Sequence, residues 1–261
     1  MIPKKLHFIF GLSPDFGGKP FSFVHWAAIR SAQIANPGYA TSFWCNHEPD
    51  NRYFDAIRPF VTVKHIEPPE TVFDRPIPHV AHKCDWLRLQ VLKEHGGIYL
   101  DVDTITLKPF EPVIESPCTM AVESCNGVTI GLCNAFIAAE PNASFILDWI
   151  EKFREFRSPG HAQHWNESAV QWPHQLWRKG GECRTLLPSS FMLPDWTSKG
   201  IRQMFVERHE FPMAIGHHLW ETMSWPYLQQ YTPESHQDQA CTYADLLHRY
   251  LGTEITRAFG V

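Results

Sequence analysis

Apolar and polar residues recur with two different spacings along the first seventy residues, and each spacing predicts a type of element. Short apolar or β-branched runs predict strands, whereas apolar residues three and four apart predict helices. In chain order, the predictions are a strand at 6–10, a helix at 21–35, a strand at 41–45, a short helix at 53–58 and a strand at 61–66. This alternation predicts an α/β fold with a doubly wound, parallel sheet.

The next apolar pattern leads into a pair of acidic residues. Residues 82–92 have helical spacing, and the glycine pair at 96–97 ends this helix and starts a strand. Side chains alternate between the faces of a strand, so Tyr99, Asp101 and Asp103 should share one face while the residues between them are buried. The two carboxylates would then converge at the carboxyl end of a strand, where parallel sheets bind ligands.

Length and charge narrow the class of protein. A chain of 261 residues suits one large domain, with or without a helical insertion. Its formal net charge of -5 gives no broad basic field, so nucleic acid is not an expected partner. A phosphate group bound by this chain would need a metal ion or local arginines.

Cysteine usage and hydropathy predict a cytoplasmic protein. The seven cysteines are scattered, with no Cys-x-x-Cys pair, which argues against a disulfide framework and a zinc site. There is no apolar run long enough for a transmembrane segment, and residues 1–12 do not resemble a signal peptide. Peripheral membrane contact stays open.

The Asp-x-Asp pattern favours a divalent cation that serves a phosphate-bearing substrate. Carboxylates suit Mg2+ or Mn2+, which keep coordination positions open for substrate phosphates. No Gly-x-Gly-x-x-Gly follows the first strand and no Walker-type Gly-Lys-Ser/Thr is present. These absences disfavour nicotinamide dehydrogenases and P-loop kinases, and favour a nucleotide-sugar enzyme.

Three motifs in order resemble the Asp-x-Asp sugar glycosyltransferases of family 32. The motifs are IPKKLHFIF at 2–10, Lys-x-Asp-x-x-Arg at 83–88 and HGGIYLDVD at 95–103, and the similarity returns in AIGHHLW at 214–220. The family includes the yeast Golgi mannosyltransferase type and the lactosylceramide galactosyltransferase type, with the clostridial glucosylating toxins as more distant relatives.

The resemblance implies a GT-A fold, which is a Rossmann-like, mostly parallel sheet with flanking helices and a helical insertion. It implies a single catalytic domain over 1–261. Residues 1–115 would form the half that binds nucleotide sugar and metal. Residues 116–261 would form the acceptor-side half with a C-terminal lid.

The resemblance also implies donor-binding roles for residues on several elements. Ile9 and Phe10 would flank the nucleotide base, Tyr99 would line the same cleft, and Asn134 would face the sugar. The sequence permits a structural alternative for two of them, which is core packing for Phe10 and a hairpin turn for Asn134.

The expected metal site combines the acidic pair with a distant histidine. Asp103 would coordinate Mn2+ or Mg2+ directly, and Asp101 would contact the ribose or reach the metal through water. Imidazole is an acceptable ligand for Mn2+, so His218 is the expected third ligand and His217 is the alternative.

Four further residues complete the expected site. Asp85 and Arg88 lie three apart on one helix face, and they would bind donor sugar hydroxyls rather than form a surface ion pair. Ser224 would reach phosphate, and Trp225 would close over the donor as part of the lid.

The resemblance therefore implies a retaining glycosyltransferase that moves a hexose from a UDP- or GDP-sugar to a glycan, glycolipid or polysaccharide. No carboxylate is assigned as a nucleophile, so same-face attack assisted by the departing phosphate is favoured. Two alternatives stay open: a protein-modifying, toxin-like or effector-like glycosyltransferase, and a non-catalytic sugar-nucleotide-binding module. The donor sugar and the acceptor are not predicted.

Overall fold

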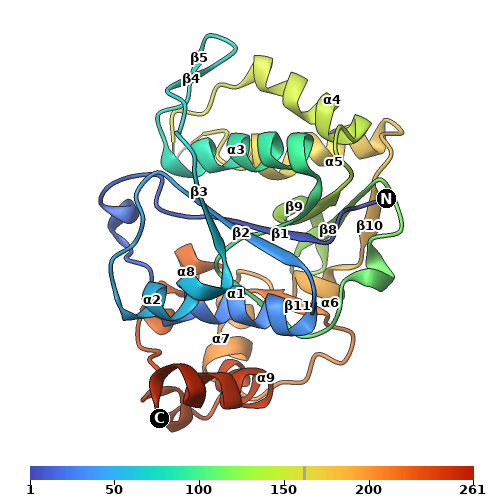
Figure 1. Cartoon of the computed structure of the whole chain (residues 1–261). Helices are drawn as coiled ribbons and strands as arrows, with labels where there is room; N and C mark the ends of the chain where they lie inside the picture. Colours follow the sequence, from blue (N-terminus) through green and yellow to red (C-terminus); the bar gives the residue numbers. More distant parts are fainter. Residues whose placement is uncertain (161–162) are drawn as a thin grey trace.

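A computed structural model describes residues 1–160 and 163–261, which form three layers with a mixed sheet in the middle (Figure 1). The strands of this sheet occur in the order β10-β8-β9-β6-β1-β2-β3. In that order their bounds are Arg184–Leu186, Cys118–Cys125, Val128–Ala139, Gly97–Leu100, Lys5–Ile9, Ala40–Cys45 and Thr62–His65.

Most neighbouring strands of this sheet run parallel. β1 pairs in parallel with β2 and β6, β2 with β3, and β8 with β10, whereas β9 runs antiparallel to both β6 and β8. Strands β8, β6 and β1 therefore point the same way, and their carboxyl ends meet at one edge. The predicted fold, a mostly parallel α/β sheet with flanking helices, is confirmed.

Helices cover both faces of the sheet. In Figure 1, α3, α4 and α5 lie above it, and α1, α2, α7 and α9 lie below it, with the C-terminus at the lower left. The helices from α1 to α9 span Phe23–Ala35, Arg52–Ile57, Val80–His95, Ser144–Lys152, Trp172–Arg178, Pro188–Phe191, Ser198–Phe205, Glu221–Leu228 and Thr242–Phe259. Two small antiparallel ribbons, β4 (Thr71–Val72) with β5 (Arg75–Pro76) and β7 (Thr104–Thr106) with β11 (Gly216–His218), complete the description.

A two-glycine turn connects α3 directly to β6. Gly96 and Gly97 have φ values of 56° and 108°, a region that favours glycine, and a Cβ on Gly97 would lie 2.8 Å from the carbonyl oxygen of Lys5. The Gly96 N–H donates to Leu92 and ends the helix. The predicted order of helix, glycine turn and strand is confirmed, although α3 extends beyond residues 82–92 at both ends.

The acidic pair does not lie on a strand, and that prediction was wrong. β6 ends at Leu100, and Asp101 to Asp103 form a turn that leads into β7. The Thr104 hydroxyl donates to the carbonyl oxygen of Asp101 at 2.9 Å and stabilises this turn. Because the chain leaves the sheet here, Asp103 turns toward β11 rather than continuing the alternation of β6.

None of the helices in the described part of the chain combines the length and the apolar character needed to cross a bilayer. All seven cysteines are unbridged.

Candidate functional site

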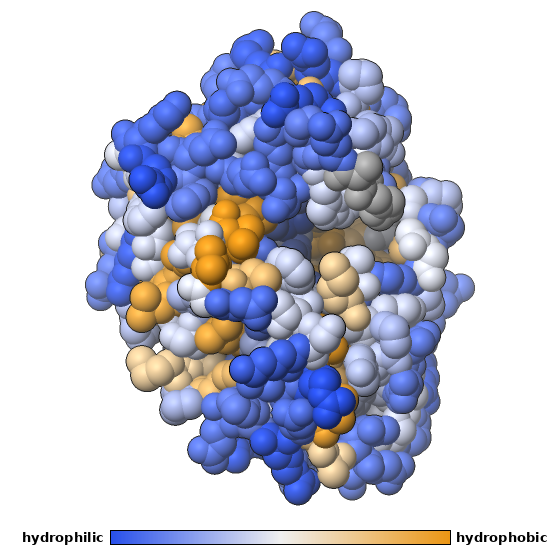
Figure 2. Space-filling model, turned by 180° about the vertical axis from the view of Figure 1, so that it is seen from behind, coloured by the Kyte–Doolittle hydropathy of each residue, from blue (hydrophilic) through white to orange (hydrophobic). Residues whose placement is uncertain are grey.

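A cavity of about 750 Å3 opens at the carboxyl ends of β1, β6 and β8. In a space-filling view from behind the orientation of Figure 1, the surface is hollowed near its centre and hydrophobic side chains lie beside the hollow (Figure 2). Most of the residues that the sequence assigned to the site line the cavity: Ile9, Phe10, Asp85, Arg88, Tyr99, Asp101, Asp103, Asn134 and His218.

The guanidinium of Arg88 holds the α3 side of the cavity together. Its Nη1 lies 3.0 Å from Asp101 and donates to the carbonyl oxygen of Asn134 at 2.9 Å, while its Nη2 lies 3.2 Å from Asp85. The remaining N–H groups meet the carbonyl oxygen and the sulfur of Cys84, and the guanidinium lies 4.5 Å from the centre of the Tyr99 ring. Because Arg88 makes three hydrogen bonds within the protein and ion pairs with Asp85 and Asp101, it acts on the site by fixing its two carboxylates.

Asp85 is buried and held from two further directions. His82, one helical turn earlier, approaches its Oδ2 at 3.1 Å, and the Asn134 amide donates to its Oδ1 at 2.7 Å. Burial opposes ionisation, but His82 and Arg88 hold the pKa of Asp85 below its ordinary value. The other ring nitrogen of His82 contacts the Ser158 hydroxyl at 2.8 Å, so the imidazole is oriented by both neighbours.

An irregularity in β9 brings Asn134 into the site. Met120 of β8 pairs with Ile137, but the next residue, Ala121, pairs with Cys133, so the residues between them bulge out of register. The carbonyl oxygen of Ala135, inside this bulge, accepts the Asp101 N–H at 3.0 Å. The bulge thus ties β9 to the acidic turn, and the hairpin-turn alternative for Asn134 is wrong.

The two aspartates of the motif have different environments. The Tyr99 hydroxyl donates to Asp101 at 2.6 Å, and burial raises the pKa of Asp101 above its ordinary value although Arg88 opposes this shift. Asp103 accepts the Glu221 backbone N–H at 2.7 Å and lies 3.3 Å from His218 Nε2. Burial would raise the pKa of Asp103, but His218 and the Glu221 N–H lower it to about 2.

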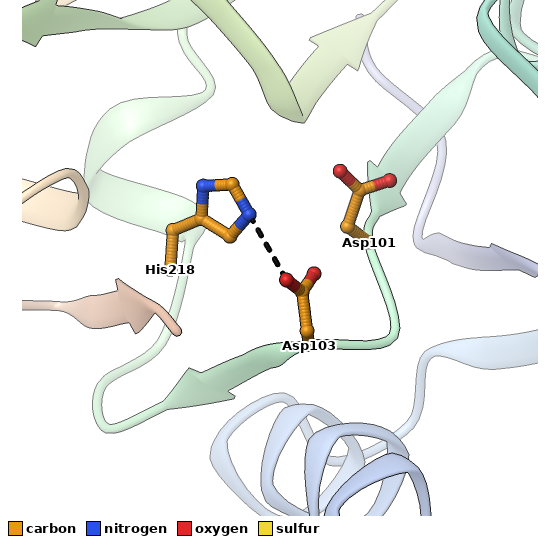
Figure 3. Close-up of side chains that lie close together, drawn as sticks. All are labelled: Asp101, Asp103 and His218. Atoms are coloured by element: carbon orange, nitrogen blue, oxygen red, sulfur yellow. Dashed lines mark ion pairs between the residues drawn. The ribbon is translucent and has the colours of Figure 1, made fainter. Parts of the chain in front are cut away.

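His218 reaches the acidic pair from β11. The antiparallel pairing of His218 with Thr104 brings the end of β11 beside the start of β7. Ligand atoms of Asp101, Asp103 and His218 all lie within 4.8 Å of one another, and Figure 3 shows the three side chains around one space. Burial would lower the pKa of His218, but Asp103 raises it above its ordinary value.

His217 points to the other side of β11. Its Nδ1 donates to the carbonyl oxygen of Leu193 at 2.6 Å, and it does not line the cavity. Burial lowers the pKa of His217 to about 4. Of the two histidines that the sequence left open, the structure brings His218 to the acidic pair.

The cluster suits a divalent cation. Asp101 and Asp103 offer hard oxygen atoms and His218 offers a nitrogen, a set that fits Mn2+ or Mg2+. Among the described residues that line the cavity, one carries a permanent positive charge, Arg88, and it is already engaged. The acidic residues that line the cavity are Asp85, Asp101, Asp103, Glu123 and Glu221.

Ile9 and Phe10 lie at the end of β1. In the strand order β9-β6-β1 the acidic turn follows the middle strand, so these two residues lie on one side of the turn and β9 lies on the other. Phe10 is half-buried, lines the cavity and stacks on Phe16 with ring centres 5.6 Å apart. It also packs against Phe21 and His25. The ring therefore belongs partly to the core and partly to the cavity wall.

Ser224 and Trp225 are not brought to the cavity. The Ser224 side chain is fully buried, and its hydroxyl donates to the carbonyl oxygens of Leu219 and Trp220, which precede α8. Trp225 is half-buried and contacts Lys19, whose Nζ lies 5.4 Å from the ring centre. The residues of this segment that do line the cavity are Trp220, Glu221, Thr222 and Met223.

The sequence analysis missed Glu123 and Trp196. Glu123 lies near the end of β8 and is 6% exposed, and burial raises its pKa. The indole of Trp196 donates to Glu123 Oε1 at 3.2 Å. A carboxylate late in an otherwise apolar strand was a usable signal for Glu123, whereas nothing local pointed to Trp196.

Comparisons with known proteins identify the family. A family model described as a glycosyltransferase sugar-binding region containing the DXD motif matches residues 24–120. The chain is 32% identical to glucan organizing enzyme 1 of Cryptococcus neoformans, over 97% of this chain and 71% of that protein. A shorter match, 30% identical over 52% of this chain and 22% of the relative, is to subversion of eukaryotic traffic protein A of Legionella pneumophila.

The fold agrees with that assignment. The apo form of the glycosyltransferase GlyE from Streptococcus pneumoniae superposes with a TM-score of 0.50 at 11% identity, over 97% of this chain and 64% of that chain. The chain therefore belongs to the DXD-motif sugar glycosyltransferases of family 32 and has a GT-A fold.

Proposed function

We propose that this glycosyltransferase is a metal-dependent, retaining hexosyltransferase that transfers a hexose from a UDP- or GDP-sugar to a glycan, glycolipid or polysaccharide. The observation that carries the proposal is the cluster of Asp101, Asp103 and His218 in the middle of an acidic cavity. A nucleotide diphosphate would be repelled by such a cavity unless a cation were bound there. The cluster supplies ligands of the right chemistry for that cation.

A cation held by Asp101, Asp103 and His218 would supply Lewis-acid stabilisation of the negative charge that grows on the leaving diphosphate. Asp101 is fixed for this role by Arg88 and Tyr99, and Asp103 by the Glu221 N–H. Because both carboxylates are already oriented, little reorganisation is needed when the donor binds.

The order of strands along the cavity edge supports an assignment for the donor. Phe10 and Ile9 at the end of β1 would contact the nucleotide, and the acidic turn after β6 would lie at the diphosphate. Asn134 on β9 and Asp85 on α3 would face the sugar. Asp85 keeps acceptor capacity for sugar hydroxyls because a carboxylate offers about four lone-pair sites.

Retention of configuration would follow from attack on the same face. The bond from the anomeric carbon to the phosphate oxygen breaks, the acceptor hydroxyl oxygen bonds to that carbon from the same side, and its proton passes to the released phosphate oxygen. Cavity walls that exclude water would favour transfer over hydrolysis. The name of the Cryptococcus relative refers to glucan, which supports a polysaccharide as the acceptor.

A panel of nucleotide sugars tests the proposal. The purified protein is incubated with UDP-glucose, UDP-galactose, UDP-N-acetylglucosamine or GDP-mannose and Mn2+, and nucleotide release is followed. We expect release from at least one donor, its loss on chelation of the metal, and its recovery when Mn2+ is returned.

The stereochemistry is read from the product by NMR of the anomeric proton. An inverted product would contradict the retaining mechanism while leaving sugar transfer intact. Release that is indifferent to chelation would contradict the metal site, and no release from any donor would contradict the proposed function.

A further inference from the structure

Along the sheet, Glu123 lies further from β1 than the residues proposed to bind the donor. The strand order places β1, β6, β9 and β8 side by side, so Glu123 on β8 is three strands from Phe10 at the end of β1. At about 4.8 Å between strands, this is a separation of about 14 Å. A nucleotide sugar that starts at β1 and crosses the acidic turn after β6 would have its hexose near β9, and the next strand would face the acceptor.

The carboxylate of Glu123 is buried but not fully engaged. Its neighbours are the indole N–H of Trp196 at 3.2 Å, the thiol of Cys133 and His218, whose imidazole interacts with it electrostatically. A carboxylate has about four acceptor sites, so it can accept further hydrogen bonds from a ligand. Among the described residues, the cluster with metal-ligand spacing does not include Glu123. A polar ligand is therefore the partner that its remaining capacity fits.

Two indole rings accompany this carboxylate. Trp196 and Trp220 both line the cavity and are half-buried. Their N–H groups are used within the protein, since Trp196 donates to Glu123 and Trp220 donates to the carbonyl oxygen of Pro194 at 2.8 Å. The Trp220 ring also packs against His218, with ring centres 3.9 Å apart. With the polar atoms engaged, the Trp196 ring and the part of the Trp220 ring away from His218 are the apolar surfaces that these residues offer to the cavity.

The segment that carries Trp196 is anchored to the β8–β9 turn. Asp195 accepts the Asn126 N–H at 2.9 Å through one oxygen, and the Thr197 N–H at 3.1 Å through the other. This anchoring fixes Trp196 against β8, so the indole and the Glu123 carboxylate form one prearranged unit.

We propose that Glu123, Trp196 and Trp220 form the acceptor subsite and that it takes a saccharide, whose ring stacks on indole while a hydroxyl donates to Glu123. The inference rests on the proposed function, because it needs a sugar donor in the same cavity. A sugar ring has apolar C–H faces and a rim of hydroxyls, which matches an indole surface beside a carboxylate acceptor. Glu123 is only 6% exposed and lies inside a cavity, so the surface of a folded protein acceptor would not reach its carboxylate.

The test separates hydrolysis from transfer. Nucleotide release is measured with water as the only acceptor, and then with high millimolar glucose, maltose, galactose, lactose or N-acetylglucosamine. We expect a saccharide to stimulate release in the unmodified enzyme. In Glu123→Gln and Trp196→Phe, the saccharide concentration for half-maximal stimulation should rise about tenfold, the effect of losing one charge-assisted hydrogen bond. Saccharide-stimulated release should fall more than hydrolysis with water as the only acceptor.

Two matched variants control for burial and residue type. Glu254→Gln removes a partly buried carboxylate on α9, and Trp177→Phe shrinks a half-buried indole on α5; neither residue lines the cavity. Both should keep the saccharide dependence of the unmodified enzyme.

Three outcomes would overturn the inference. They are hydrolysis without any saccharide effect, an unchanged saccharide dependence in Glu123→Gln, and equal losses of hydrolysis and transfer, which would assign Glu123 to the donor. If the enzyme releases no nucleotide from any donor, the proposed function fails as well, so the two failures are distinguishable.

Discussion

The cavity has two walls that differ in how much of their polar capacity the protein itself uses. The wall formed by α3 and β6 carries Arg88, Asp85 and Asp101, and that guanidinium makes three hydrogen bonds and pairs with both carboxylates. The opposite wall, from β8 and the segments after residue 190, carries Glu123, His218 and half-buried indoles with few polar contacts. Both walls are organised before a ligand arrives, but Arg88 on the α3–β6 wall is engaged by protein groups, whereas Glu123 on the opposite wall keeps acceptor capacity for a ligand.

The largest expected effect comes from breaking the α3–β6 wall. Arg88→Met would leave Asp85 and Asp101 buried without their cation, and we expect a loss of about 3–5 kcal/mol in the free energy of unfolding. Urea denaturation monitored by circular dichroism measures this loss. Arg154→Met, which removes an exposed pair with Glu151, is the control and should cost at most about 1 kcal/mol. Equal costs would show that the Arg88 network is not a structural unit.

The next effect concerns Asp103, which lies in the turn after β6 and contacts His218 on the opposite wall. Asp103→Asn removes a metal-binding oxygen, and we expect nucleotide release to fall at least about 100-fold. The metal-free variant should also lose stability, because the folded protein lowers the pKa of Asp103 to about 2 and so favours the charge that asparagine removes. Thermal unfolding with and without Mn2+ checks both parts, since the stabilisation by Mn2+ should disappear in the variant. Nucleotide release within about tenfold of that of the unmodified enzyme, or stabilisation by Mn2+ that persists in the variant, would contradict the metal-ligand role of Asp103.

The difference between the walls also explains what the sequence could predict. The helix and strand that carry Asp85, Arg88 and Tyr99 follow from local apolar spacing and from the glycine pair between them, so that wall was predicted from contiguous residues. The end of β6 was not predictable in the same way. Strand pairing from β9 reaches Leu100 and no further, and pairing partners are not encoded in the strand itself.

The opposite wall depends on contacts between residues far apart in the chain. Trp196 reaches Glu123 across 73 residues, and Asp195 is held by Asn126 across 69 residues. His218 was predicted only through the family resemblance, and its proximity to Asp103 requires the pairing of β7 with β11. Such long-range pairing leaves no period or spacing in the sequence, which is why Trp196 was missed.

The two adjacent histidines on β11, His217 and His218, should make stability depend on pH in opposite directions. Burial lowers the pKa of His217 to about 4, so the unfolded chain binds a proton more readily than the folded one between about pH 6.5 and 4. Stability should therefore fall as pH falls through this range, by about 2 kcal/mol from His217 alone. In His217→Phe this part of the acid sensitivity should be lost, as measured by urea denaturation at pH 7 and pH 4.5.

The contribution of His218 to stability should change with pH in the opposite direction. Asp103 raises its pKa, so its contribution is present below the unfolded value of 6.5 and is lost as pH rises through the folded value. In chelator, His218→Gln should therefore lower stability more at pH 6 than at pH 9. The same pH trend in both variants would contradict the opposite environments of the two imidazoles.

The smallest effect is expected from the residues that the sequence assigned to a lid but that the structure keeps away from the cavity. The Ser224 hydroxyl bonds only to carbonyl oxygens of its own segment, and Trp225 packs beside Lys19. Ser224→Ala and Trp225→Phe should change kcat and the KM for the donor by no more than about twofold, because neither group meets the donor unless α8 moves. Steady-state nucleotide release measures both constants. A fall in kcat of tenfold or more in Trp225→Phe would show that α8 closes over the donor. The C-terminal segment would then belong to the opposite wall, together with Glu123 and His218.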